Sequence, residues 1–262
     1  MPKKKEMLKK KAVQEIQPVN PLFEQARIQI VGIERQRQGI GTLSEKTVHA
    51  ILKLYYAPDT DMHEIPIENY VADIYTGKEI IEIQTRQFNR MRDKLAAFLK
   101  LYPVTIVYPI PRNKWLIWID EESGELSKPH KSPVKGNVYQ AFPELYKIKN
   151  FLKDPNLHLK LVFLDMEEYR LLNGWSHDKK RGSHRFDRIP SALTGEVCVG
   201  GVKDYMQFIP YELEEPFTSD MFAKAAHINK SLAQVVLNIL TYVECVERIG
   251  KKGNAILYRV SE

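Results

Sequence analysis

The pattern of apolar and polar residues predicts a pair of antiparallel strands in the first third of the chain. Residues 65–74 are rich in Ile, Val and Tyr, residues 79–84 alternate between apolar and polar, and Thr76-Gly77 between them is typical of a turn. Because successive side chains of a strand point to opposite faces, we expect Glu82 and Gln84 to share one face.

Each of the two predicted strands contains an acidic residue, Asp73 in the first and Glu82 in the second, and pairing of the strands can bring their carboxylates together. A turn centred on Thr76-Gly77 places Asp73 opposite Ile80 and diagonal to Glu82, whereas a turn two residues longer places Asp73 directly opposite Glu82. A slip of one residue would separate them. Facing carboxylates without a cation repel by a few tenths to ~1 kcal/mol, so we favour a site here over two solvated acids on an exposed sheet face.

Helical patterns flank the strands. Residues 22–38 are predicted to be partly helical, and Thr42-Leu-Ser-Glu45 matches a capping box that opens the next helix. Glu45 either caps this helix with Thr42 or reaches the acidic face of the strands. His49, one turn later, is interpreted as a packed or surface residue rather than a ligand. Thr85 is expected to be the N-cap of a helix over residues 85–100.

The next segments complete an α/β pattern. The sequence predicts strands over residues 103–110 and 114–119, a loop or long hairpin over 120–137, a helix over 138–152 and a strand over 157–164. Alternating helices and strands of this kind indicate the α/β class, with a sheet core at about residues 40–165.

The C-terminal segment has its own pattern. Thr218 or Ser219 is expected to cap a short helix, and an apolar stripe predicts a second helix over residues 231–243. Strands at 245–249 and 255–260 follow, around a glycine-flanked Lys251-Lys252 tip. Residues 217–262 therefore resemble a winged helix-turn-helix module, which implies phosphate contacts for Lys251 and Lys252. Such modules also bind proteins, so a protein partner or homo-oligomer remains an alternative, and no preceding first helix is evident.

Charge adds two candidate contact segments. The formal net charge is +6, most of it from lysines in residues 1–16, which we interpret as a flexible basic arm. Residues 173–190 form a basic segment with Trp175 and Phe186 interleaved, which suits a nucleic acid as well as a plain mobile loop. Its candidate nucleic-acid-binding residues are Lys179, Lys180, Arg181, Arg185 and Arg188.

Other features narrow the class of protein. The chain has no apolar run long enough to cross a membrane and no signal-peptide pattern, so no membrane partner and a cytoplasmic location are expected. Cys198 and Cys245 lack metal-ligand spacing and are predicted to be buried thiols. Phosphate-binding-loop, Gly-x-Ser-x-Gly and His-Glu-x-x-His motifs are all absent.

Glu45, Asp73 and Glu82-Ile-Gln84, in helix-strand-strand-helix order, resemble the PD-(D/E)XK nuclease superfamily over residues 40–110. The Glu-x-Gln form is similar to competence-associated nucleases. The resemblance implies a restriction-endonuclease-like mixed sheet flanked by helices in residues 17–209. It also implies hydrolysis of phosphodiester bonds, with DNA favoured over RNA, by a water that Mg²⁺ or Mn²⁺ activates.

The resemblance assigns a role to each of these residues. Asp73 and Glu82 would bind the metal with the carbonyl of Ile83, and Glu45 would assist catalysis. Gln84 would orient water where most members have lysine. Because its amide lacks lysine's charge, a non-catalytic nucleic-acid-binding or regulatory protein is the alternative function.

Overall fold

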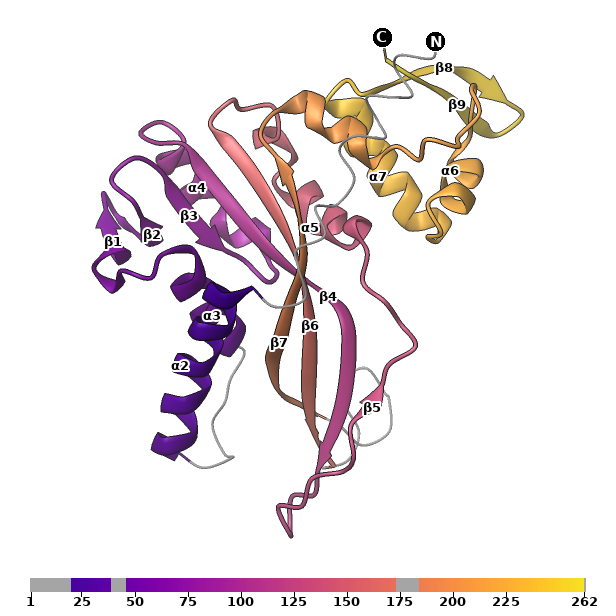
Figure 1. The fold of residues 1–262 in the computed structure, drawn as a ribbon. Helices are drawn as coiled ribbons and strands as arrows, with labels where there is room; N and C mark the ends of the chain where they lie inside the picture. The colour runs from indigo at the N-terminus through magenta and orange to yellow at the C-terminus, as the bar shows by residue number, and fades with distance from the viewer. Residues whose placement is uncertain (1–19, 39–45, 173–183, 262) are drawn as a thin grey trace.

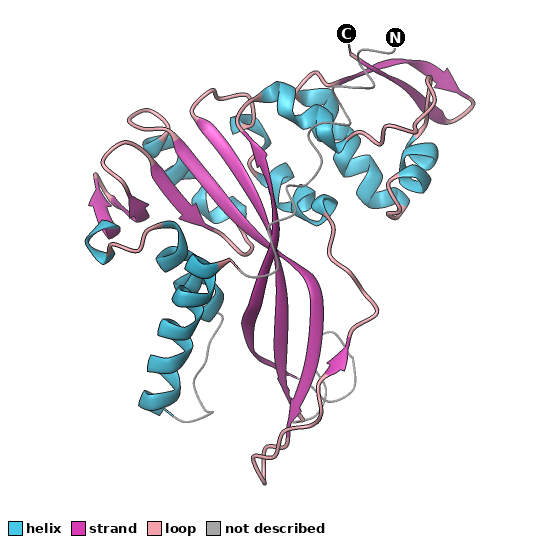
Figure 2. Cartoon of the chain, in the orientation of Figure 1, coloured by secondary structure: helices cyan, strands magenta, loops and turns pink. Residues whose placement is uncertain are grey.

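A mixed sheet organises the protein, whose computed structural model describes residues 20–38, 46–172 and 184–261. Figure 1 shows its strands at the centre of the molecule, and Figure 2 shows the helices on both sides. The spatial order is β1 (His63–Ile67), β2 (Tyr70–Tyr75), β3 (Ile80–Ile83), β4 (Val104–Ile119), β6 (Leu157–Leu171) and β7 (His184–Val199), with β5 (His130–Lys131) paired to β4. The predicted α/β class with a mixed, helix-flanked sheet is confirmed.

The central strands β3, β4 and β6 run parallel, and their other neighbours in the sheet are antiparallel. Parallel neighbours need a crossover, and helices α4 (Arg92–Phe98) and α5 (Phe142–Lys147) lie in the two crossovers. Residues 104–107 of β4 are all buried, as expected for a strand that is covered on both faces.

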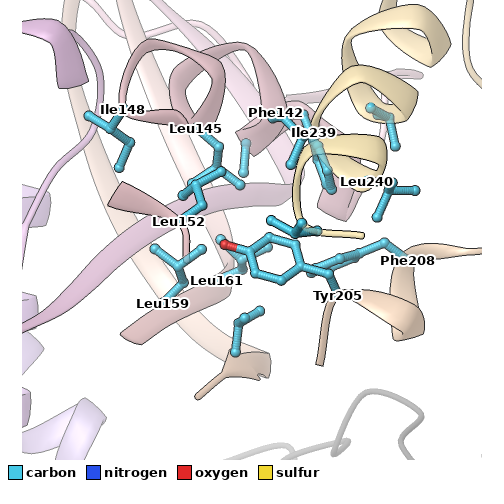
Figure 3. Close-up of a cluster of buried hydrophobic side chains, with 14 of the residues drawn as sticks. Phe142, Leu145, Ile148, Leu152, Leu159, Leu161, Tyr205, Phe208, Ile239 and Leu240 are labelled. Atoms are coloured by element: carbon cyan, nitrogen blue, oxygen red, sulfur yellow. The ribbon is translucent and has the colours of Figure 1, made fainter. Parts of the chain in front are cut away.

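Two hydrophobic clusters lie on the two faces of the sheet. On one face, α2 (Pro21–Gln38) and α3 (Lys46–Tyr56) bury side chains such as Ile51 and Leu52 against Ile81. The other cluster joins α4 and α5 to the C-terminal helices, and Figure 3 shows part of it around Tyr205. None of the helices in the described ranges is both long and apolar enough to cross a membrane.

The C-terminal segment has the predicted order of elements. Thr218 caps α6 (Ser219–Ala225), Asn229 caps α7 (Lys230–Tyr242), and β8 (Val246–Lys252) pairs with β9 (Ala255–Val260). Ile239 and Leu240 of α7 lie in the same cluster as Phe142 of α5 (Figure 3). The segment therefore shares its core with the sheet, and its likeness to a winged helix stays a prediction.

Several predicted boundaries were wrong in the N-terminal half. The run before Thr76 forms two strands, β1 and β2, because Glu68 adopts a left-handed turn conformation with φ of 51° between them. Thr85 does not begin a helix. Gln87, at φ 62°, instead precedes the short 3-10 helix η3 (Phe88–Met91), after which α4 begins.

Further corrections concern the long strands. The two strands predicted at 103–119 are one strand, β4, with a register shift between Pro111 and Asn113. The helix predicted at 138–152 is divided into η4 (Val138–Ala141), α5 and η5 (Lys149–Phe151), because Ile148 is not helical. Strand β6 continues to Leu171.

The basic segment and the cysteines also differ from their predictions. Residues 184–190 are the first part of strand β7 rather than a loop, because they pair with the extended end of β6. Cys198 is exposed, since it lies on this same strand with its side chain outside the core, whereas Cys245 is buried as expected. The basic arm, Glu45, Lys179, Lys180 and Arg181 lie outside the described residues.

Candidate functional site

Asp73 and Glu82 meet where strands β2 and β3 separate. The two strands pair through Tyr75–Ile80 and Ile74–Ile81, so the next positions, Asp73 and Glu82, are directly opposite each other. Here side chains replace the backbone ladder: the Asp73 N–H donates to Glu82 Oε1 at 3.2 Å, and the Ile83 N–H donates to Asp73 Oδ2 at 2.8 Å. The structure thus selects the longer of the two predicted turns and brings the carboxylates together.

Each carboxylate contacts a basic side chain from a different helix. Lys94 on α4 places its Nζ 2.6 Å from Glu82 Oε2. His49 on α3 places its Nε2 3.0 Å from Asp73 Oδ2. The acidic pair is therefore held from both faces of the sheet, because α3 and α4 cover opposite faces.

Burial and charge set the protonation of this pair. Glu82 is fully buried, and burial together with the nearby charge of Asp73 raises the pKa of Glu82 to about 7, although Lys94 opposes the shift. Burial also raises the pKa of Asp73, but the His49 hydrogen bond and charge and the Ile83 N–H outweigh it, and the net direction is downward. Near neutral pH, Glu82 can therefore bind or release a proton while Asp73 stays ionised.

Gln84 follows directly at the end of β3. Its backbone N–H donates to Val107 O at 2.9 Å, which keeps it aligned with β4. The side chain of Gln84 is half-buried. By strand alternation Gln84 shares the face of Glu82, while Ile83 between them is buried against the α2–α3 cluster.

The donor set of the site suits a hard cation in its chemistry. Asp73 and Glu82 offer carboxylate oxygens, and Mg²⁺ and Mn²⁺ prefer oxygen ligands and retain water. Within the described ranges, no group of three or more His, Cys, Asp or Glu side chains is arranged to hold a metal. Two carboxylates and a backbone carbonyl are therefore the protein ligands that this part of the chain can offer.

A cavity of about 440 Å³ lies past the end of β3, and neither Asp73 nor Glu82 lines it. Val48 and Thr85 line it, and they are the sequence neighbours of His49 and Gln84. Its wall carries four basic residues and one acidic residue: Arg86, Lys114, Arg185, Arg188 and Asp187. The cavity wall therefore carries net positive charge, which would attract a phosphate-containing ligand.

The other predicted contact residues fall in two places. Arg185 and Arg188 lie on β7, where Arg188 Nε donates to Glu168 Oε2 at 2.9 Å. Lys251 and Lys252 are exposed at the end of β8. Because β8 lies at the opposite side of the molecule from β2 and β3 in Figure 1, the structure does not bring these two lysines to the acidic pair.

Sequence reasoning missed Lys94, Lys114 and Glu168. Lys94 lies twelve positions after Glu82, and no local periodicity links a strand residue to a helix residue at that spacing. Lys114 and Glu168 approach each other only because β4 and β6 pair in parallel. Glu168 and Arg170 lie two residues apart on one strand and therefore share a face, and this alternation is the one sequence signal that could have identified Glu168.

More than half of the chain matches the model of a known protein family. Residues 46–200 match the family described as "Domain of unknown function (DUF8091)". The chain belongs to this family. The DUF8091 region begins with α3 and ends just after β7, so it contains His49, Asp73, Glu82, Gln84 and Lys94.

One relative extends beyond the DUF8091 region. A protein of Treponema pallidum (strain Nichols), described as uncharacterized, is 23% identical over 218 residues, which cover 83% of this chain and 76% of the relative. No solved structure matches the chain significantly.

Proposed function

We propose that this DUF8091 protein is a metal-dependent nuclease that hydrolyses phosphodiester bonds, with DNA as the favoured substrate. The observation that carries the proposal is the convergence of Asp73 and Glu82 at the separation of β2 and β3. A basic cavity lined by Thr85, which directly follows Gln84, supports it. A carboxylate pair and a phosphate-attracting pocket are the two parts that such a reaction needs.

The metal would be Mg²⁺ or Mn²⁺, held by Asp73, Glu82 and the carbonyl of Ile83. The fit rests on the donor chemistry and on the repulsion between the two carboxylates, which contributes to the raised pKa of Glu82. When bound, the metal would activate a water molecule and neutralise charge on the scissile phosphate.

The chain's own side chains have separate tasks in this proposal. Lys94 fixes Glu82 through the 2.6 Å contact and supplies the positive charge that Gln84 lacks. The Gln84 amide can donate to and accept from a water molecule, and so can orient it. His49 fixes the orientation of Asp73, and Arg86 on the cavity wall attracts the substrate's phosphates.

Cleavage assays test the proposal. The purified protein is incubated with linear, nicked, branched and single-stranded DNA, and with matched RNA, in the presence of Mg²⁺ or Mn²⁺. We expect cleavage of DNA that Asp73→Asn and Glu82→Gln both abolish, while the exposed-residue control Glu212→Gln retains it. Cleavage that persists unchanged in both site variants, or no cleavage of any substrate, would contradict the proposal.

One observation favours a second candidate, a non-catalytic nucleic-acid-binding protein that retains this fold as a platform. Lys94 and His49 already contact the two carboxylates, so each carboxylate has a side-chain partner without a metal. Under this alternative, DNA binds equally tightly with EDTA or Mg²⁺, its affinity depends strongly on salt, and no product forms.

A further inference from the structure

Strands β4, β6 and β7 continue past the helices α4 and α5 as a long three-stranded ribbon (Figure 1). In this ribbon, Glu168 of β6 pairs with Leu116 of β4 on one side and with Arg188 of β7 on the other. Two residues further along the strands, Trp118 of β4 pairs with Arg170 of β6. Paired residues share a face, and so do residues two apart. One face of the ribbon therefore carries a defined set of basic and aromatic side chains.

A single buried carboxylate organises the basic residues of this face. Glu168 is fully buried and accepts from Arg170 Nε at 2.8 Å and from Arg188 Nε at 2.9 Å, and Arg185 Nε lies 3.8 Å away. Burial raises the pKa of Glu168, but Arg188, Arg170 and Lys114 outweigh it and hold the pKa at about 2. The carboxylate is therefore ionised at neutral pH and fixes the guanidinium groups in place.

The cluster has more positive than negative charge. Within the described ranges, three arginines and Lys114 lie around the carboxylate of Glu168. This excess of positive charge affects the pKa of Lys114. Burial lowers this pKa, the three arginines lower it further, and the charge of Glu168 opposes them. Arginines held in fixed geometry and in excess over their acidic partner are suited to bind phosphate groups.

The cluster and the residues that follow β3 line one cavity. Lys114, Arg185 and Arg188 line the same cavity as Thr85 and Arg86, which directly follow Gln84. Its volume of about 440 Å³ lies within the range of small-ligand sites, about 300–1,000 Å³, and is too small to enclose a base-paired duplex. The cavity can therefore accept part of a single strand but not a duplex.

An aromatic ring extends this path toward the end of the ribbon. The guanidinium carbon of Arg170 lies 5.9 Å from the ring centroid of Trp118, on the face that carries Glu168. Trp115 has the opposite orientation, because it pairs with Glu167, and Lys131 lies over its ring. An indole beside arginine is typical of surfaces on which unpaired bases stack.

We propose that this face of the ribbon binds a single-stranded nucleic-acid segment, with its phosphates on the cluster around Glu168 and a base on Trp118. This inference rests on the proposed function for the nature of the ligand, and it assigns the single strand as the part of the substrate next to the acidic pair. It concerns binding and does not require that the acidic pair cleave.

Fluorescence anisotropy with labelled oligonucleotides in EDTA, where cleavage is blocked, tests the proposal. The probes are a single-stranded oligonucleotide, a duplex of the same length and a mononucleotide. We expect Lys114→Gln to bind the single strand roughly tenfold more weakly, with a salt slope shallower by about 0.7 for each lost phosphate contact. Lys203→Gln, which removes an exposed lysine on the 3-10 helix at residues 202–208, is the matched control and should bind normally.

Three further variants test which side chains of the ribbon face contribute to binding. Glu168→Gln with Arg188→Gln leaves the net charge of the cluster unchanged but removes the carboxylate that holds Arg170 and Arg185 in place, and should also weaken binding. Trp118→Leu should weaken binding of the single strand, whereas Trp115→Leu, on the other face, should not. Thermal melting of each variant checks that the fold is retained.

Three outcomes would overturn the proposal: equal affinities for Lys114→Gln and Lys203→Gln, a duplex that binds more tightly than the single strand, or a mononucleotide that binds as tightly as the oligonucleotide. Cleavage by the unmodified protein together with any of these would reject this inference alone. Weakened binding in the ribbon variants without any cleavage would reject the nuclease proposal alone.

Discussion

Asp73 donates its backbone N–H to the Glu82 carboxylate at 3.2 Å, across the point where β2 and β3 separate. The carboxylate of Asp73 in turn accepts the N–H of Ile83 at 2.8 Å. These two bonds take the place of ladder hydrogen bonds, so the two acids hold the ends of the separated strands. The geometry of the acidic pair is therefore built into the sheet, which is the arrangement that a site requiring fixed ligands needs.

Lys94→Met is expected to lower the cleavage rate on the order of 10²-fold, because it removes a fixed positive charge beside Glu82. It should also raise the pKa of Glu82 further and move the pH profile of cleavage upward. Rates measured against pH, with Lys94→Arg as the charge-conserving control, check both effects. A normal rate with an unchanged pH profile would show that Lys94 has only a structural role.

Binding of Mn²⁺ should depend on pH through Glu82. Because the pKa of Glu82 is raised to about 7 and metal ligation needs the carboxylate form, protons compete with the metal below that pH. We expect stabilisation by Mn²⁺ in thermal melts to grow as the pH rises from about 6 to about 8. Glu82→Gln should remove this growth, and equal stabilisation at both pH values in the unmodified protein would argue against metal ligation by Glu82.

Acid should destabilise the protein in part through Glu168. Its folded pKa of about 2 lies below the ordinary value of 4.5, so its contribution is fully present above the ordinary pKa and is lost as the pH falls toward 2. The shift corresponds to ~3 kcal/mol. In urea unfolding between about pH 5 and pH 3, Glu168→Gln should therefore lose less stability than the unmodified protein. Parallel pH profiles for the two proteins would contradict the assignment.

Gly136→Ala should destabilise the protein by ~1–3 kcal/mol, because the added Cβ would lie 2.2 Å from the backbone oxygen of Pro111. The change would also displace one wall of the basic cavity. Gly32→Ala is the matched control: nothing lies within 4 Å of its added Cβ, and alanine in a helix should stabilise by ~0.5–1 kcal/mol. Urea unfolding measures the free energy of unfolding of both variants. Equal changes in this free energy would show that the backbone near Pro111 moves away from the added Cβ without loss of stability.

Ile239→Ala should destabilise the whole protein by ~2–5 kcal/mol, because this fully buried side chain of α7 lies in the same core as α5 and the sheet (Figure 3). Tryptophan fluorescence, which includes Trp115 and Trp118 of β4, and circular dichroism should report one coincident transition. Gln234→Ala, exposed on the same helix, is the control. Two separate transitions would instead support an autonomous C-terminal module.

Much of the local structure could be predicted from the sequence. The apolar stripe of 231–243 predicts α7 nearly to the residue, and Thr218 is one of the two caps predicted for α6, because these signals depend on neighbours within one or two turns. The breaks at Gln87 and Ile148 were not predicted, since both depend on how the flanking helices pack against the sheet.

The candidate site was predictable only in part. Alternation along the strands indicated that Asp73 and Glu82 converge, because a period of two fixes the face of every side chain once two strands pair. Which of two registers applies was left open. The acidic pair, with Gln84 beside it, is thus the part of the candidate site that the sequence by itself determined.

Tertiary structure alone decided which basic side chains reach these carboxylates and which arginines gather around Glu168. Lys94 and His49 come from helices on opposite faces of the sheet, and Glu168 gathers its arginines across strands that are distant in sequence. Such contacts follow from strand order and helix packing, which no local pattern encodes. The sequence determines which residues carry the charge, and the fold decides which of them become neighbours.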